Sequence, residues 1–196
     1  MTKATETRKA ILQKAFQLIY TQGYQTTSID DIIATTKVTK GAFYYHFKSK
    51  DDMGLAIINE IVRPTMEESF IKPLQLTKDP IKEIYGMTKN LLFDNPYLKI
   101  EHGCPAGNLT QEMTPWNHEF SKALSELMQE WQHTIEVCLK KAKKEGTVRK
   151  TINPSQVAFF IMSGYWGIRN FGKLYNNDDC YHTYLKELKR YLLELK

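Results

Sequence analysis

The sequence predicts an all-α protein in which three short N-terminal helices precede a larger helical body, with about nine helices in total. Apolar residues recur at helical spacing along almost the whole chain, and strict alternation over several residues is hard to find. Cap residues followed by proline or by an acidic residue mark several helix starts. All the excess positive charge lies in residues 1–50, which hold eight Lys or Arg against three Asp or Glu, whereas residues 51–196 hold 19 of each sign.

The first two predicted helices are amphipathic and end at recognisable signals. The first spans about residues 5–22 and is followed by Gly23, which suits a left-handed cap. Ser28 followed by Asp31 resembles a capping box, in which the side chain of each residue accepts a hydrogen bond from the backbone N–H of the other. This box predicts a second, short helix that stops near Thr36.

The third predicted helix spans residues 40–47, after a turn through residues 37–38 and a cap at Thr39. Phe43 and Phe47 lie one turn apart and are expected to point inward. A rotation of about 100° per residue turns the opposite face outward. That face carries small, aromatic and basic side chains, namely Gly41, Ala42, Tyr44, Tyr45, His46 and Lys48.

The rest of the chain continues as helices. Ser49 opens a fourth helix from Lys50 that runs to Arg63 or beyond, where Pro64 removes a backbone donor and predicts a kink or a break. Proline after a cap residue starts further helices over about 80–95 and 154–175. Glycine and proline predict that the stretch 95–114 is broken. Two more helices are expected, one over about 115–144 that ends at Gly146 and one that begins near Asp178.

The N-terminal part has the arrangement of a helix-turn-helix, in which the second short helix enters the major groove of DNA. Gly41 and Ala42 would keep the backbone close to base edges, and the tyrosines could donate to phosphates. Basic side chains at the rim and hydroxyls before the second helix would add phosphate contacts. Two alternatives without DNA binding remain: a solvated basic surface, or a small core filled by Tyr44, Tyr45 and His46.

Residues 5–65 resemble the DNA-binding domain of the TetR family of transcriptional regulators, most sharply in the run VTKGAFYYHFKSKDD that ends at Asp52. The resemblance implies that Lys40, Gly41, Tyr44, His46 and Lys50 match positions that commonly touch operator DNA. It also implies that residues 26–28 match phosphate contacts. The predicted DNA-binding set is Thr26, Thr27, Ser28, Thr39, Lys40, Gly41, Ala42, Tyr44, Tyr45, His46, Lys48 and Lys50.

The last two predicted helices carry more apolar surface than one partner helix can cover. The final helix repeats apolar residues at spacings of four and three, as in a coiled-coil seam. The family resemblance implies a homodimer joined by these two helices, and a purely intramolecular core is the alternative. The predicted interface is Val157, Ile161, Gly164, Ile168, Phe171, Leu185, Leu188 and Leu192.

The middle of the chain is expected to hold an effector site. The segment 103–109, followed by Trp116 and Trp131, is similar to the corresponding stretch in one subgroup of TetR regulators. Cys104, two residues after His102, could be a thiol that senses oxidants or electrophiles, or else an inert buried thiol. The predicted ligand-binding residues are Tyr85, Phe93, Cys104, Met113, Trp116, Phe120, Trp131, Tyr165, Trp166 and Arg169.

Other classes of function find little support. The five histidines form no H-x-x-x-H or H-E-x-x-H pair, and no phosphate-binding loop occurs, so neither a metal nor a cofactor is expected. Three widely spaced cysteines suggest reduced thiols and no disulfide framework. An enzyme with a Cys104 nucleophile assisted by His102 or His118 would need these residues to meet in space. A helical interaction module without DNA binding would show no salt-dependent DNA affinity.

The sequence therefore predicts a ligand-responsive transcriptional regulator, most simply a repressor that a small-molecule inducer releases from a pseudo-palindromic operator. Residues 1–50 would form the DNA-binding domain, extending into a connecting helix over 50–65. Residues 51–196 would form the effector-binding and dimerisation domain. No apolar run approaches the ~20 residues of a membrane span and no secretory signal is recognisable, so a cytoplasmic protein is expected.

Overall fold

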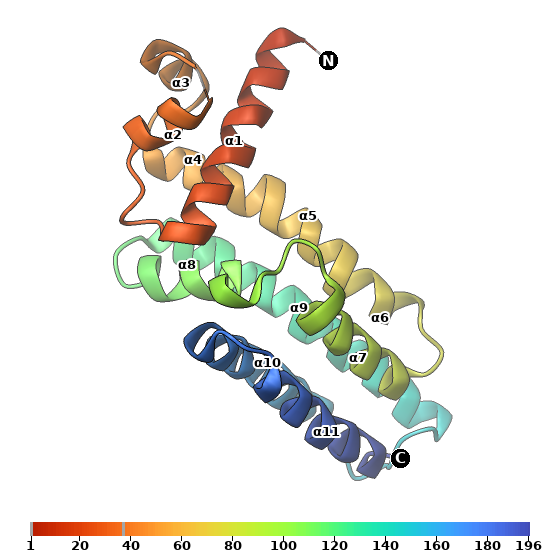
Figure 1. Ribbon diagram of the computed structural model, residues 1–196. Helices are drawn as coiled ribbons and strands as arrows, with labels where there is room; N and C mark the ends of the chain where they lie inside the picture. Colours follow the sequence, from red (N-terminus) through yellow and green to blue (C-terminus); the bar gives the residue numbers. More distant parts are fainter. Residues whose placement is uncertain (1, 37) are drawn as a thin grey trace. The chain divides into compact units, whose positions relative to one another are not determined.

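The computed structural model describes residues 2–36 and 38–196, and within them the chain is helical throughout, which confirms the all-α prediction (Figure 1). Nine helices are present if the uninterrupted run over 50–76 is counted once, and one 3₁₀ turn, η4 (Ile100–His102), separates two of them. The helices are α1 (Lys3–Gln22), α2 (Ile29–Thr36), α3 (Lys40–His46), the run of α4 (Lys50–Ile57), η1 (Ile58–Val62), α5 (Arg63–Met66), η2 (Glu67–Ile71) and α6 (Lys72–Leu76), then α7 (Pro80–Lys89) with its extension η3 (Asn90–Asp94), α8 (Pro105–Met113), α9 (His118–Glu145), α10 (Pro154–Tyr175) and α11 (Asp179–Glu194).

The predicted caps form as side-chain hydrogen bonds. Ser28 Oγ accepts from the Asp31 backbone N–H at 3.1 Å, while Asp31 accepts from the Ser28 N–H at 2.9 Å, so the capping box is confirmed. Oxygens of Thr39, Ser49 and Asn153 likewise accept backbone N–H groups at the starts of α3, α4 and α10. These bonds satisfy donors that a helix start would otherwise leave without a partner.

Two helix ends differ from the prediction. Gly23 adopts φ 96° and ψ 157°, a positive-φ conformation that is extended and not left-handed helical, although its N–H still bonds to the Ile19 carbonyl. The helix predicted from residue 115 begins at His118, because Asn117 Oδ1 accepts the N–H groups of Glu119 and Phe120 and so caps it. Gly146, at φ 76°, ends α9 as expected.

Pro64 and Pro105 interrupt the helices less than the sequence predicted. The helix from Lys50 does not break at Pro64, because η1 just before it is a wider π-helical turn in which the Arg63 N–H reaches back to the Ile58 carbonyl. The stretch 95–114 is broken as predicted over residues 95–104, where η4 is the one regular turn, but the remainder contains the nine-residue helix α8. Pro105 is the first residue of α8, where its missing N–H costs no hydrogen bond.

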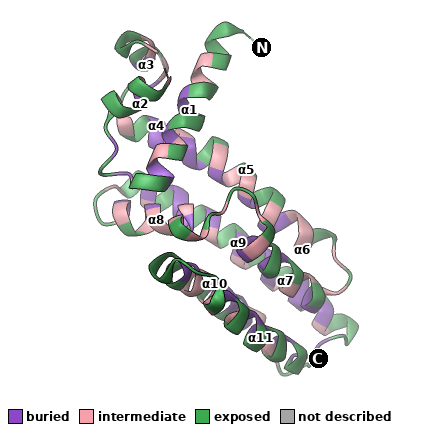
Figure 2. Cartoon of the chain, in the orientation of Figure 1, coloured by how far each residue is buried: buried purple, intermediate pink, exposed green. Residues whose placement is uncertain are grey.

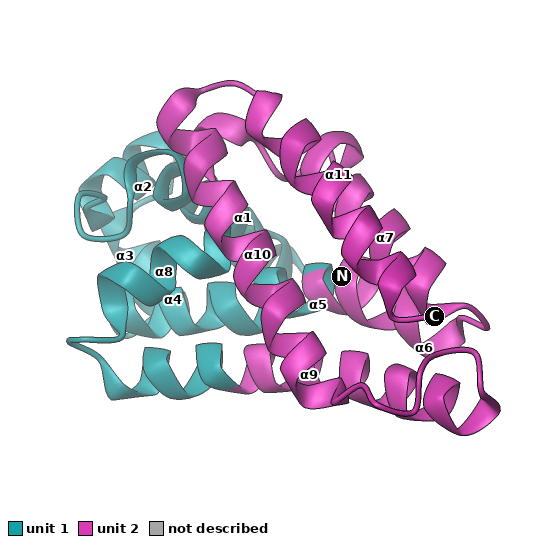
Figure 3. Ribbon diagram, turned by 90° about the horizontal axis from the view of Figure 1, so that it is seen from below, with its two compact units in different colours: residues 1–65, 105–125 teal, residues 66–104, 126–196 magenta. Residues whose placement is uncertain are grey.

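The chain divides into two compact units, residues 1–65 with 105–125 and residues 66–104 with 126–196 (Figure 3). The first unit packs α1 to η1, α8 and the start of α9 around buried apolar side chains, including Ile11, Ile32, Phe43, Phe47 and Phe120 (Figure 2). The second unit has its own core, in which the rings of Phe70, Trp131 and Tyr165 meet edge to face at centroid distances of 5.0 to 5.6 Å.

Gly54 should tolerate no side chain. A Cβ atom there would lie 2.5 Å from Phe120 Cζ and 2.8 Å from Tyr24 Cε2, both inside the first unit. We expect Gly54→Ala to lower the free energy of unfolding by about 1–3 kcal/mol through overpacking. Gly86→Ala is the matched control, since no atom lies within 4 Å of its added methyl group, and it should stabilise α7 by up to about 1 kcal/mol. Urea titrations that moved both midpoints alike would contradict this packing argument.

Candidate functional site

The outward face of α3 is the candidate nucleic-acid interface. Phe43 and Phe47 are fully buried, as predicted from their spacing, and their rings pack at 5.7 Å. On the opposite side Tyr44 is 48% and Tyr45 78% exposed, so these tyrosines do not fill a small core. Gly41 is also exposed, and a Cβ atom there would meet only Thr39 Oγ1, at 3.9 Å. The surface is therefore open to a partner close to the helix backbone.

The lysines around this face differ in how readily they could bind a phosphate. Lys48 is exposed, whereas Lys40 Nζ pairs with Asp30 of α2 at 3.1 Å, and this hydrogen bond raises the pKa of Lys40. Lys50 Nζ lies 4.4 Å from the Tyr24 ring centroid, and partial burial lowers the pKa of Lys50. A phosphate at Lys40 would have to compete with Asp30, and Lys50 is held against the core of its unit.

The hydroxyls before α2 are already engaged within the protein. Thr27 is fully buried and its hydroxyl donates to the Gly23 carbonyl at 2.7 Å, which makes it a structural residue in this conformation. The Thr26 hydroxyl donates to the Gln22 carbonyl, and the Ser28 hydroxyl donates to Asp31 at 2.6 Å. Of the three predicted phosphate contacts, only Thr26 and Ser28 are exposed. The predicted turn includes Lys37, which lies outside the described residues.

Hydrogen bonds tie α8 and the start of α9 to the helix-turn-helix. The Tyr24 hydroxyl donates to Asp51 Oδ1 at 2.6 Å, and Asn117 Nδ2 donates to Asp51 Oδ2 at 3.0 Å. The backbone N–H of Gln25 donates to Glu112 of α8 at 3.0 Å. Sequence reasoning missed this network, because its members lie far apart in the chain and share no local spacing.

Asp51 should matter for stability because Tyr24 is only 2% exposed. Burial, with the hydrogen bond to Asp51, raises the pKa of Tyr24 and keeps its hydroxyl a donor. We expect Asp51→Ala to cost about 1–3 kcal/mol of unfolding free energy, since it leaves that donor without its acceptor. Adding Tyr24→Phe should recover part of the loss. A double-mutant cycle by urea denaturation measures this coupling, and strictly additive effects would contradict it.

The predicted effector residues are divided between the two units. Met113 and Phe120 belong to the first unit, where Met113 Sδ accepts from Gln25 and Phe120 packs on the Tyr24 ring. Trp116, in the same unit, is 81% exposed and so does not line an enclosed cavity. The other seven lie in the second unit, with Trp131, Tyr165 and Arg169 fully buried. These seven are Tyr85, Phe93, Cys104, Trp131, Tyr165, Trp166 and Arg169.

The thiols lie mostly in the interior. Cys104 is 8% exposed, which favours the buried alternative over an exposed sensor. Cys138 is also buried, and burial raises its pKa to about 11, so its reactive thiolate is scarce at neutral pH. Among the described residues, no group of three or more His, Cys, Asp or Glu is arranged to hold a metal ion.

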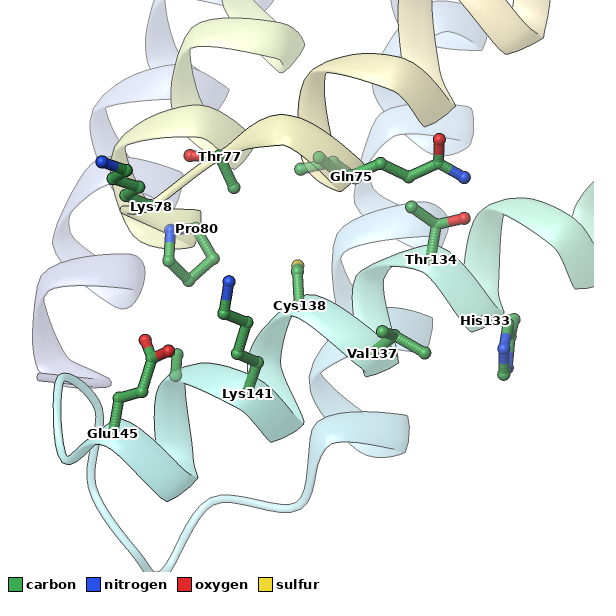
Figure 4. A pocket seen from close by; sticks show the side chains of 12 residues that line it. Gln75, Thr77, Lys78, Pro80, His133, Thr134, Val137, Cys138, Lys141 and Glu145 are labelled. Atoms are coloured by element: carbon green, nitrogen blue, oxygen red, sulfur yellow. The ribbon is translucent and has the colours of Figure 1, made fainter.

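A separate cavity of about 220 Å³ lies in the second unit. Figure 4 shows Cys138 and Lys141 of α9 pointing toward the connection between α6 and α7, at Thr77, Lys78 and Pro80. None of the ligand-binding residues predicted from the sequence lines this cavity.

The predicted dimer interface needs correction, because most of it lies in the interior of the second unit. Val157 and Ile161 of α10 and Leu185, Leu188 and Leu192 of α11 are buried within the single chain. The coiled-coil seam of α11 packs against α7 and α10 of the same unit. Another stripe of α10 is left partly uncovered, and it includes Phe171 of the predicted set. Its members are Phe160, Gly167, Phe171 and Leu174, of which the three large residues are 49–74% exposed.

Comparisons with known proteins agree with this architecture. Residues 11–57 match the family described as "Bacterial regulatory proteins, tetR family", and residues 93–188 match "Tetracyclin repressor-like, C-terminal domain". An uncharacterised HTH-type transcriptional regulator in the lacX 3′ region of Lactococcus lactis subsp. lactis is 36% identical over 129 residues, which are 66% of each chain. The HTH-type transcriptional repressor DhaR of Mycobacterium sp. (strain GP1) is 23% identical over 170 residues, covering 83% of this chain and 80% of DhaR.

Solved structures share the fold. A TetR transcriptional regulator from Chloroflexus aurantiacus J-10-FL superposes with a TM-score of 0.88 at 24% identity, covering 99% of this chain and 98% of that one. A TetR-family regulator from Cytophaga hutchinsonii gives the same TM-score at 18% identity, covering 100% and 98%. In the part of the chain that the structure describes, no helix combines the length and apolar character that crossing a membrane requires.

Proposed function

Because the chain belongs to the TetR family of transcriptional regulators, a family of DNA-binding proteins and not of enzymes, we propose that it is a repressor that a small-molecule inducer releases from a pseudo-palindromic operator. The observation that carries the proposal is the outward face of α3, where Gly41, Tyr44 and Tyr45 are exposed beside basic residues. Tyr45 is largely exposed, and Tyr44 packs one side of its ring on Phe43 while the rest is exposed, so both suit contacts to phosphates and thymine methyl groups.

In the proposed complex α3 enters the major groove. Gly41 and Ala42 bring the start of the helix close to base edges, and Lys48 approaches phosphates without first breaking an ion pair. The structural role of Thr27 removes it from the proposed contacts. The proposed DNA-binding set is Thr26, Ser28, Thr39, Lys40, Gly41, Ala42, Tyr44, Tyr45, His46, Lys48 and Lys50.

The proposed operator-binding form is a homodimer. Two copies would cover each other's partly uncovered α10 seam, Phe160, Gly167, Phe171 and Leu174, and so remove exposed aromatic rings from water. A two-fold pair of recognition helices matches half-sites about 34 Å apart, which is one turn of DNA. Exposed apolar residues at coiled-coil spacing support this arrangement.

Release would follow from a shift between two spacings of the recognition helices. The helix α9 begins in the first unit and continues into the second, and its cap residue Asn117 bonds to Asp51 beside the helix-turn-helix. A ligand that moves α8 or α9 would therefore move α1 and α4 as well. An inducer needs to favour the non-binding spacing by only a few kcal/mol to empty the operator.

The test is selection of random DNA duplexes by the purified protein, followed by binding of the selected duplex across a salt series. We expect a pseudo-palindrome and a steep log–log salt dependence, because each neutralised phosphate releases counterions. Binding after denaturation and refolding removes any inducer carried through purification. Absence of an enriched sequence from the refolded protein would overturn the proposed function.

A further inference from the structure

Arg169 is a buried cation without a carboxylate partner. Its side chain is fully buried in the second unit, and within residues 2–36 and 38–196 it donates to two backbone carbonyls and pairs with no carboxylate. Nη2 donates to the carbonyl oxygens of Lys99, at 2.8 Å, and Gly103. Nε and Nη1 are shielded from solvent and have no acceptor. A buried guanidinium with unused donors is costly, because it has lost water without gaining a negative partner.

Further buried polar groups of the second unit have no hydrogen-bond partner. The Tyr181 hydroxyl is buried without a hydrogen-bond partner, and the Tyr181 ring centroid is 5.7 Å from the guanidinium carbon. Nε1 of Trp131 is also buried and unbonded, and the Trp131 ring packs on Tyr165, which lies one turn before Arg169 on α10. Guanidinium and indole N–H groups can only donate. The Tyr181 oxygen can accept one N–H group, but it supplies no negative charge to balance the buried guanidinium.

We propose that Arg169 binds the carboxylate of a small organic acid, and that this acid is the inducer. The inference rests on the proposed function, since it names the chemical class of the inducer. A buried water could accept one of the free N–H groups, but it would leave the positive charge unbalanced. A carboxylate supplies acceptors for several donors and a single negative charge, which matches the single cation.

The position of Arg169 also connects binding to release. The same guanidinium holds the carbonyls of Lys99 and Gly103, and the chain passes from Gly103 into α8 at Pro105. An anion that draws the guanidinium toward itself would weaken these bonds and free the segment that leads into α8. Since Glu112 of α8 accepts the Gln25 N–H, the movement would reach the helix-turn-helix.

The experiment compares acids with their neutral amides. Acetate, butyrate and benzoate, each paired with its amide, and inorganic phosphate are titrated into the refolded full chain while melting temperature and tryptophan fluorescence are recorded. At least one acid should raise the melting temperature and release the selected operator, and its amide should bind roughly ten- to hundredfold more weakly, as expected for a lost charged hydrogen bond. Arg169→Gln should abolish the response to the acid, and Tyr181→Phe should weaken it.

Controls keep the outcome decisive. Lys186→Gln removes a positive charge from the exposed surface of α11 and should leave the response unchanged. If circular dichroism shows that Arg169→Gln does not fold, the test rests on the difference between the acid and amide responses of the wild-type protein and of Arg169→Lys. Equal responses to acid and amide, a stronger response to phosphate, or no response to any acid would overturn the inference. Operator binding without an acid response overturns this inference alone, whereas an acid response without operator binding overturns the proposed function alone.

Discussion

Gly41→Leu should strongly weaken operator binding without harming the fold. In the free protein an added Cβ at position 41 meets only Thr39 Oγ1, at 3.9 Å, so the side chain enters open space. Replacing a glycine inside a helix also favours helix formation by up to about 1 kcal/mol. The melting temperature should therefore stay constant or rise.

The loss of binding follows from geometry in the groove. If α3 lies against base edges, a leucine at position 41 occupies the space through which the backbone approaches them. Each half-site would lose contacts worth about 1–3 kcal/mol, so two half-sites together lower the operator affinity by roughly 30-fold to 10⁴-fold. Fluorescence anisotropy with the selected duplex measures this change.

Gly86→Leu is the matched control for this substitution. Gly86 is an exposed helical glycine of the second unit with no atom within 4 Å of an added Cβ, so leucine there should change neither stability nor DNA affinity by much. Unchanged operator affinity of Gly41→Leu would show that α3 does not approach the bases at its start.

Gly167→Arg should convert the protein to a monomer. Gly167 lies in the uncovered seam of α10, and an added Cβ there meets no atom within 4 Å in the single chain. The folded monomer should therefore accept arginine. In a two-fold pair, the two copies of the substituted residue would place bulk and like charges where the helices approach.

Sedimentation should then show a monomer for Gly167→Arg and a dimer for the wild type and Gly86→Arg. Operator affinity should fall by roughly 10²–10⁴, because a second half-site no longer binds at high effective concentration. Gly164→Arg is a poor substitute, since a Cβ there would lie 2.6 Å from the Tyr184 hydroxyl and would disturb the monomer itself. A dimeric Gly167→Arg protein would remove this seam from the interface.

Local chemistry explains why much of the fold could be predicted. The cap at Ser28 and Asp31 and the inward pair Phe43 and Phe47 depend on residues three or four positions apart, and such spacings are visible in a sequence. The same periodicity turned Tyr44 and Tyr45 outward. The effects of Pro64 and Pro105 were harder to predict from the sequence, because the cost of a missing N–H depends on the hydrogen-bonding pattern of the turn around it.

Periodicity cannot identify what covers an apolar face. The sequence shows surplus apolar surface on α10 and a seam on α11, but the seam of α11 is buried inside its own unit, whereas Phe160, Phe171 and Leu174 of α10 stay exposed. Helices that are distant in the chain decide this by packing. Packing likewise decides that the Thr27 hydroxyl donates to the Gly23 carbonyl and that Trp116 is exposed.

The sequence by itself determined the helical class, most helix starts and the outward face of α3, because these follow from backbone hydrogen bonding and helical spacing within a few residues. Only the tertiary structure decided that Asp51 joins Tyr24 to Asn117 and that Arg169 is buried without a carboxylate. Such contacts join residues separated by tens of positions, and burial sets their energy by removing water from charged and polar groups.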